Sequence, residues 1–336
     1  MSIHYEFDVR PDYGDVNAVA DGIHWLRMPL PFALSHINLW MLRDGDGIAV
    51  VDTGINSGKS RGIWRAAIAD RPVTSVFVTH LHPDHVGCAG WLCDEHDVEL
   101  WMPREEYLLC RILVADTGRA APEAGVHFYN AAGFPHSALE RYQEMFGMFG
   151  KFVAPLPESY CRLVDNATVS IDGSDWDTLI GKGHSPEHAC LFNAERNVVI
   201  SGDQLLPKIS SNVSVYPTEP HGNPLEEWID SLRQLKDRLP EDVLVLPAHG
   251  RPFRGAHERL DALVEEHMTG LEKLLDMCDE PRRAVDVFPA LFKAKISDSN
   301  LIMATGESIA HLNYLLADGS ICVEADKDGV LWYRRL

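Results

Sequence analysis

Four residues whose side chains bind metal ions lie within one six-residue segment, in the order His80, His82, Asp84 and His85. Because residues two positions apart in an extended segment point the same way, His80 and His82 can bind one ion. Asp84 and His85 follow Pro83 around a bend and can face a second ion. Neutral imidazole and carboxylate suit zinc, and also iron or manganese. The spacing therefore predicts a metal site rather than a chance surface cluster.

Two ions need more than four ligands, and three further candidates lie downstream. His184 stands in a Gly-His-Ser segment, Asp203 in Ser-Gly-Asp and His249 in Ala-His-Gly, each directly after an apolar run. Each is a weak signal alone, because a lone histidine after a strand is more often a hydrogen-bonded loop residue. Together they favour a binuclear site built from distant parts of the chain.

The elements that must position these residues alternate between strands and helices. Apolar, β-branched runs predict strands, which end where the candidate ligands begin. Such runs cover 22–28, 37–42, 48–52, 73–78, 168–171, 176–180, 189–192, 198–200 and 243–246, and a turn at 44–47 joins the second and third. Helical patterns cover 57–69, 225–238, 256–277, 284–292 and 308–318, and a hairpin is expected over 320–333. The order predicts an α/β sandwich of layers.

Residues 103–152 differ from their surroundings and predict a helical insertion. Glycines and aromatic residues such as Phe128 and Phe134 interrupt the helical pattern. The insertion either packs against the core or forms an apolar lid over a substrate, since methionine and phenylalanine give an adaptable binding surface.

The series His-x-His-x-Asp-His, Gly-His-Ser, Ser-Gly-Asp and Ala-His-Gly, together with Asp52 in Val-Asp-Thr-Gly, resembles the metallo-β-lactamase superfamily over about residues 20–255. The resemblance implies an αββα sandwich, with residues 1–255 as the catalytic domain and the metals at one edge of the sheets. Asp52 would orient a ligand, and Glu187 and His188 match no ligand position. The implied ligands are His80, His82 and His184 for one ion, Asp84, His85 and His249 for the other, and Asp203 as the bridge.

Residues 256–336 resemble, more loosely, the winged-helix-like extension of a hydrolase subgroup with glyoxylase-like and endoribonuclease-like members. The matching piece is a helix followed by a turn, at 308–319. Acidic residues outnumber basic ones in this tail, so we interpret it as a packing or dimerisation module, and a homodimer is one expectation.

The expected activity is that of a binuclear metal-dependent hydrolase. Two divalent ions, zinc in the first place and iron or manganese as alternatives, would share a hydroxide that attacks a carbonyl ester of the thioester or lactone type. Asp84 would also be catalytic as a proton shuttle. Lys208 and His221 are candidates for substrate contact. The alternatives are a phosphodiesterase or ribonuclease, a mononuclear iron oxygenase of the persulfide type, a β-lactamase proper, and a non-catalytic scaffold.

Composition indicates which binding partners and which cellular compartment to expect. A net charge of −20 argues against a nucleic-acid partner, because such binding depends on neutralising phosphates, so a small-molecule substrate is expected. The chain has 7 cysteines and no Cys-x-x-Cys pair, which favours reduced thiols. The sequence has no apolar stretch of membrane-spanning length and no pattern typical of a secretion signal at its start, so a cytoplasmic protein without membrane association is expected.

Overall fold

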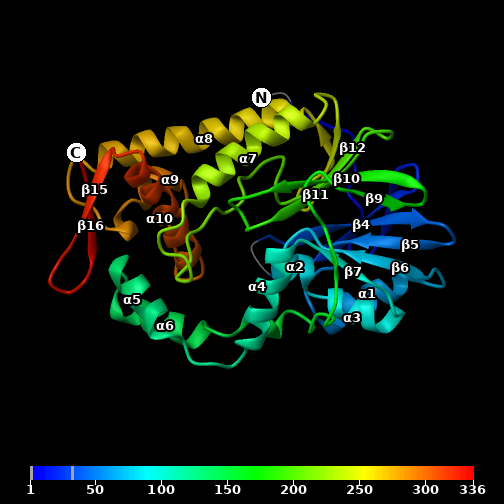
Figure 1. Cartoon of the computed structure of the whole chain (residues 1–336), viewed down its shortest axis with the longest axis horizontal. Helices are drawn as coiled ribbons and strands as arrows, with labels where there is room; N and C mark the ends of the chain where they lie inside the picture. The colour runs from blue at the N-terminus through cyan, green and yellow to red at the C-terminus, as the bar shows by residue number, and fades with distance from the viewer. Residues whose placement is uncertain (1–2, 32–33) are drawn as a thin grey trace.

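The computed structural model of the chain describes residues 3–31 and 34–336. Two seven-stranded mixed sheets pack face to face, and helices cover their outer faces (Figure 1). The predicted αββα sandwich is therefore confirmed. Its central layer consists of apolar side chains from both sheets, among them Trp40, Val51, Trp176 and Ile200.

The first sheet is antiparallel at one side and parallel at the other. Its order is β2 (Val16–Ala20), β3 (Ile23–Pro29), β4 (His36–Asp44), β5 (Gly47–Val51), β6 (Val73–Phe77), β7 (Leu100–Met102) and β8 (Cys161–Arg162). Strands β5 to β8 run parallel to one another. Helices α1 (Gly58–Ile68) and α3 (Ala89–His96) pack on its outer face, as expected for parallel strands that are buried on both sides.

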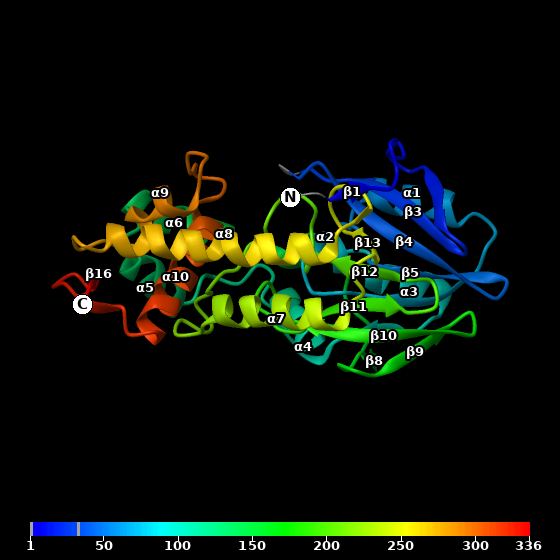
Figure 2. The same cartoon turned by 90° about the horizontal axis from the view of Figure 1, so that it is seen from above.

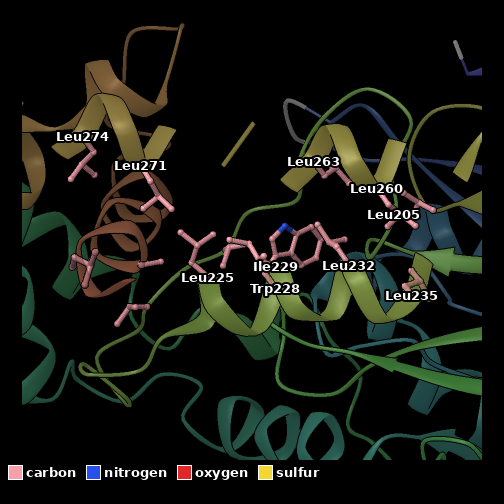
Figure 3. Close-up of a cluster of buried hydrophobic side chains, with 14 of the residues drawn as sticks. Leu205, Leu225, Trp228, Ile229, Leu232, Leu235, Leu260, Leu263, Leu271 and Leu274 are labelled. Carbon is pink, nitrogen blue, oxygen red and sulfur yellow. The ribbon is translucent and has the colours of Figure 1, made fainter. Parts of the chain in front are cut away.

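The second sheet carries one parallel pair, between β12 and β13. Its order is β1 (His4–Tyr5), β14 (Phe253–Arg254), β13 (Leu244–Pro247), β12 (Val198–Gly202), β11 (His188–Asn193), β10 (Ser174–Gly181) and β9 (Thr168–Ile171). Helix α7 (Pro224–Arg238) packs against this sheet and against α8 (Ala256–Met277). Figure 3 shows the joint core, in which Trp228 and Leu232 of α7 face Leu260 and Leu263 of α8.

Helix α8 links the sandwich to the C-terminal part of the chain. Its 22 residues extend over about 33 Å, and Figure 2 shows it running from the sheets to the region of α10. The C-terminal part contains η2 (Ala284–Asp286), α9 (Phe288–Leu291), α10 (Leu301–Ala317) and the hairpin β15 (Ile321–Ala325) and β16 (Leu331–Arg335). Among the described residues, no helix is long and apolar enough to cross a membrane.

Two boundaries in this part differ from the sequence prediction. The helix expected over 284–292 is a short 3₁₀ turn and one turn of α-helix, which begins just before Pro289. The helix expected from Ser308 begins at Leu301. Gly306 obscures that start, because glycine disfavours helices. In the fold it is required, since a Cβ there would lie 2.7 Å from Ser214 Oγ.

The insertion is helical, as predicted, and it packs on the C-terminal part. It contains α4 (Arg104–Ala115), α5 (Glu123–Ala131), α6 (His136–Met145) and η1 (Phe149–Lys151). Helices α5 and α6 lie away from the sheets (Figure 1) and bury Tyr129 and Tyr142 against Val285, Leu301 and Ile302. The structure thus agrees with a packing role, whereas motion as a lid stays a prediction.

The cysteines provide a test of this burial. All 7 are free, and all but Cys161 and Cys322 are buried. Burial raises the pKa of the buried thiols to about 11 or about 12. Because the thiolate is the reactive form, a disulfide reagent at pH 8 should react fastest with Cys322, more slowly with the partly accessible Cys161, whose pKa burial also raises, and with all 7 thiols after unfolding. Rapid native reaction of further thiols would contradict the fold, and Cys322→Ser should remove one fast thiol.

Candidate metal centre

The candidate ligands meet because parallel strands end at one edge of the sandwich. Asp52 and Thr79 follow the parallel strands β5 and β6, and Asp203 and His249 follow the parallel strands β12 and β13. The backbone N–H of Ala189 in β11 donates to the Thr79 carbonyl across the two sheets. The loops of both sheets are therefore held together at this edge.

The structure brings all seven predicted ligands together in two groups. His80, His82, His184 and Asp203 form one group, and Asp84, His85 and His249 form the other. Within each group, the candidate ligand atoms lie within 4.8 Å of one another. Asp84 and His85 lie on the short helix α2 (Pro83–Val86), which begins with the proline of the motif. The grouping matches the sequence prediction, with Asp203 between the two groups.

Three imidazoles are oriented by a hydrogen bond from Nδ1. His85 Nδ1 lies 2.8 Å from Asp52 Oδ2, His184 Nδ1 2.7 Å from the Asn212 carbonyl, and His249 Nδ1 2.8 Å from the His36 carbonyl. These oxygens can only accept, so Nδ1 carries the proton. In the neutral ring, each Nε2 then keeps a free lone pair, as metal ligation requires.

The free nitrogens converge on Asp203. Its carboxylate oxygens lie 3.4 Å from His184 Nε2, 3.6 Å from His85 Nε2 and 3.4 Å from His249 Nε2. Two ligands of one tetrahedral zinc ion, each bound at about 2.0–2.2 Å, are separated by about 3.3–3.6 Å, so these distances fit ligands of a shared ion.

Within the described part of the chain, three of these buried atoms have no hydrogen-bond partner: His85 Nε2, His184 Nε2 and Asp203 Oδ1. Buried polar atoms rarely stay unpaired. Their arrangement around a carboxylate fits metal ions bound between them.

Burial and charge favour the ligand forms of His80, His82 and Asp203. Burial, reinforced by neighbouring His85, lowers the pKa of His80 well below its usual range, and burial lowers the pKa of His82 to about 3. Burial opposes ionisation of Asp203, yet His249 and His85 hold its pKa well below its usual range. Neutral imidazoles and an ionised carboxylate are the ligand forms. Burial opposes protonation of His85 and His249, yet neighbouring carboxylates raise the pKa of both, so a metal ion bound there would displace a proton.

Asp52 orients residues of the first motif through hydrogen bonds, as the resemblance implied. Its carboxylate accepts hydrogen bonds from the Thr79 backbone N–H at 2.8 Å and from the Thr79 hydroxyl, as well as from His85. The Thr79 oxygen in turn lies 3.0 Å from His80 Nδ1. One buried carboxylate thus orients ligands of both groups.

Glu106 is a positioning residue that sequence reasoning missed. Its side chain is fully buried in the first turn of α4. One oxygen accepts the backbone N–H of Leu81 at 2.9 Å, and the other accepts that of Glu187 at 2.8 Å. Glu106 therefore joins the loop of His80 and His82 to the loop of His184. In the sequence, Glu105-Glu106 resembles the solvated acidic start of an ordinary helix.

The remaining sequence candidates lie outside the two groups. The backbone N–H of Asp203 donates to His188 Nε2 at 3.0 Å, so His188 orients the bridging candidate instead of binding metal. A Cβ at Gly202 would lie 2.6 Å from that ring, which explains the glycine. Lys208 and His221 are exposed, and their contact with substrate stays a prediction.

Comparison with known proteins agrees with this geometry. Residues 34–249 match the family model of the metallo-beta-lactamase superfamily, and residues 271–336 match that of the metallo-beta-lactamase-like C-terminal domain. The chain belongs to the metallo-β-lactamase superfamily. It resembles the crystal structure of a beta-lactamase domain protein from Burkholderia ambifaria, with 38% identity, a TM-score of 0.90 and coverage of 99% of this chain and 98% of the other.

Curated relatives of this metallo-β-lactamase-fold chain are more distant. It is 24% identical to hydroxyacylglutathione hydrolase GloC of Haemophilus influenzae, over 62% of this chain and 82% of the relative. It is 23% identical to acyl-coenzyme A thioesterase MBLAC2 of Bos taurus, over 75% of this chain and 86% of the relative. At this distance, their activities do not transfer to the chain by similarity alone.

Replacement of Asp203 tests the centre. In Asp203→Ala both groups lose the carboxylate on which they converge, so we expect bound metal to fall from two ions per chain to one or fewer. Elemental analysis after equilibration with Zn²⁺ measures this. Asp286→Ala is the control, because that carboxylate is bound by Arg283 in the C-terminal part. Two ions retained at unchanged affinity in Asp203→Ala would contradict the assignment.

Replacement of Glu106 tests the joint between the ligand loops. Glu106→Gln turns one acceptor into a donor that faces a backbone N–H, and an unsatisfied buried group costs about 1–3 kcal/mol. We expect a loss of that size in the free energy of unfolding and weaker Zn²⁺ binding. The exposed neighbour gives a matched control, Glu105→Gln. Equal behaviour of the two variants in denaturant unfolding and metal titration would refute the role of Glu106.

Proposed function

We propose that this protein hydrolyses a small-molecule carbonyl ester, with a thioester as the first choice and a lactone as the second. The observation that carries the proposal is the pair of ligand groups at the edge of the sandwich, with Asp203 of one group in contact with His85 and His249 of the other. When bound there, two divalent ions, zinc in the first place, would lower the pKa of a water molecule and polarise a carbonyl oxygen. The chain's own residues must bind the substrate and move the proton.

Asp84 suits proton transfer to the leaving group. Its carboxylate oxygen lies 3.5 Å from His249 Nε2, and its side chain is partly accessible to solvent. The other carboxylate of the centre, Asp203, is buried and surrounded by His85, His184 and His249. Of the two, Asp84 is therefore the group that can exchange a proton with a bound substrate.

Exposed apolar side chains on the two segments that meet at Asn212 support an acyl substrate. The Asn212 carbonyl orients His184, and the Asn212 side chain donates to the Met303 carbonyl at 3.4 Å. Met303 is 52% exposed and Ile209, in the same loop as Asn212, is 42% exposed. Lys208 precedes Ile209 and would meet an anionic part of the substrate. His221 is a further candidate for substrate contact.

The names of the relatives agree with this choice, since two of them are a thioesterase and a hydroxyacylglutathione hydrolase. Further parts of the proposal concern the whole chain. We place the boundary of the catalytic domain at 255 and interpret 256–336 as a winged-helix-like extension of the glyoxylase-like and endoribonuclease-like subgroup. A cytoplasmic location, a homodimer, and the absence of nucleic-acid and membrane partners belong to the same proposal.

A substrate panel tests the function. Purified protein with measured metal content is assayed on acyl-coenzyme A and acylglutathione thioesters, lactones, β-lactams, phosphodiesters and single-stranded RNA. We expect two zinc ions per chain and turnover of thioesters or lactones, which Asp84→Asn reduces about 10²–10⁴-fold, as for loss of a proton-transfer group. Turnover confined to RNA or phosphodiesters, or one iron ion with oxygen consumption, would replace this function by the corresponding alternative.

A further inference from the structure

The loop that follows Asp203, residues 205–212, holds two of the metal-site residues in place. The Ser211 hydroxyl donates to the backbone carbonyl of Asp203, and the Asn212 carbonyl accepts the Nδ1 proton of His184 at 2.7 Å. The direction in which His184 presents its Nε2 therefore depends on where this loop places the Asn212 carbonyl. Three sets of hydrogen bonds connect this loop to α8 and α10.

A buried arginine of α8 makes the first tie. Arg259 is 3% exposed, and its guanidinium donates to the Leu206 carbonyl at 2.7 Å and to the Ile209 carbonyl at 2.8 Å. Within the described residues no carboxylate lies at ion-pair distance from it. Burying an unpaired cation is costly, and the hydrogen bonds of Arg259 to two loop carbonyls offset part of that cost.

A chain of hydrogen bonds from Ser210 makes the second tie, and its direction can be derived. The Glu307 carbonyl can only accept, so His311 Nδ1 donates to it at 2.8 Å. Neutral His311 then accepts at Nε2 from His267 Nδ1, at 3.2 Å. His267 Nε2 is left to accept from the Ser210 hydroxyl, at 3.0 Å.

This chain resembles a catalytic triad, but its chemistry differs. Burial lowers the pKa of His267 to about 3 and that of His311 to about 4. An imidazole that binds a proton so weakly is a poor general base at neutral pH. Ser210, His267 and His311 therefore tie the loop to α8 and α10.

The third tie reaches the loop residue that contacts His184. The Asn212 side-chain amide donates to Glu307 Oε2 on α10 at 2.7 Å. The Ser214 hydroxyl holds the amide oxygen of Asn212 from the other side. Asn212 thus connects α10 to His184 through two consecutive hydrogen bonds, one from its side chain and one to its backbone.

We propose that α8 and α10 form the outer support of the metal centre, and that Glu307 is a positioning residue that sets the affinity of the site through Asn212 and His184. The C-terminal part then does more than pack or dimerise. The proposal rests on metal binding at the two ligand groups and is independent of the substrate. A protein that binds two ions but does not cleave thioesters would overturn the proposed function and leave this inference standing.

Three variants on α10 test the proposal. Glu307→Ala removes the nearer acceptor for Asn212, at 2.7 Å, and leaves the Met303 carbonyl at 3.4 Å, whereas Glu307→Gln keeps a carbonyl oxygen in its place. Asn313→Ala is the matched control, because Asn313 lies on the same helix, is also partly buried, and donates to the Pro220 and Gly222 carbonyls of a loop without metal ligands. Zn²⁺ affinity is measured by competition with a coloured chelator, and the visible spectrum of the Co²⁺-loaded protein reports ligand geometry.

We expect Glu307→Ala to bind Zn²⁺ about tenfold more weakly, at the low end of the range for residues that orient a ligand, and to change the Co²⁺ spectrum. Glu307→Gln should restore both, and Asn313→Ala should keep wild-type affinity even where its melting temperature falls. Wild-type affinity in Glu307→Ala, or an equal loss in Asn313→Ala, would overturn the proposal.

A second pair of variants keeps the test decisive if Glu307→Ala does not fold. Asn212→Ala removes the other side of the same hydrogen bond but leaves the backbone carbonyl for His184, and it should weaken Zn²⁺ binding in the same direction. Ser210→Ala removes the donor to His267 at a partly exposed position and should do likewise. Unchanged affinity in both variants would show that the loop needs no support from α8 and α10.

Discussion

Each imidazole of the metal centre must present a bare nitrogen to an ion, and this depends on the hydrogen bond made by its other nitrogen. His85, His184 and His249 each donate Nδ1–H to an oxygen that can only accept. The three oxygens come from separate segments of the chain: the end of β5, the loop 205–212 and the start of β4. The fold of the sandwich therefore fixes the tautomers of these histidines, and the side chains can act as metal ligands only within it.

The same dependence explains why the strands are paired as they are. The parallel pairs β5–β6 and β12–β13 place their loops at one edge of the sandwich, and the carboxyl ends of β6, β12 and β13 carry ligands there. Asn38 of β4 holds the loop of His249 from the opposite sheet, donating from its backbone to Ala248 and from its side chain to Pro247. Loss of registry between the two sheets would therefore separate the ligands before it unfolded either sheet.

The parts of the site that were predictable from sequence are those encoded locally. The spacing of the residues from His80 to His85 predicts a metal site. The positions of Asp203 and His249 directly after apolar runs predict further ligands. Glu106 could not be found in this way, because its partners Leu81 and Glu187 are distant in sequence and their N–H groups leave no trace in it. The His36 and Asn212 carbonyls are equally hidden, since every residue has one. The start of α10 at Leu301 could not be predicted for a similar reason. Gly306 is required by the close approach of Ser214, which the sequence does not show.

The position of Glu106 within the insertion has a consequence for how the chain is organised. Glu106 lies in the first turn of α4, before the chain leaves the sandwich for α5 and α6. The hydrogen bonds that join the ligand loops are thus made before the chain reaches α5 and α6. A change in the length of the segment beyond α4 would therefore leave the two hydrogen bonds of Glu106 in place. In this respect the junction of the ligand loops and the helical excursion are separate units of the chain.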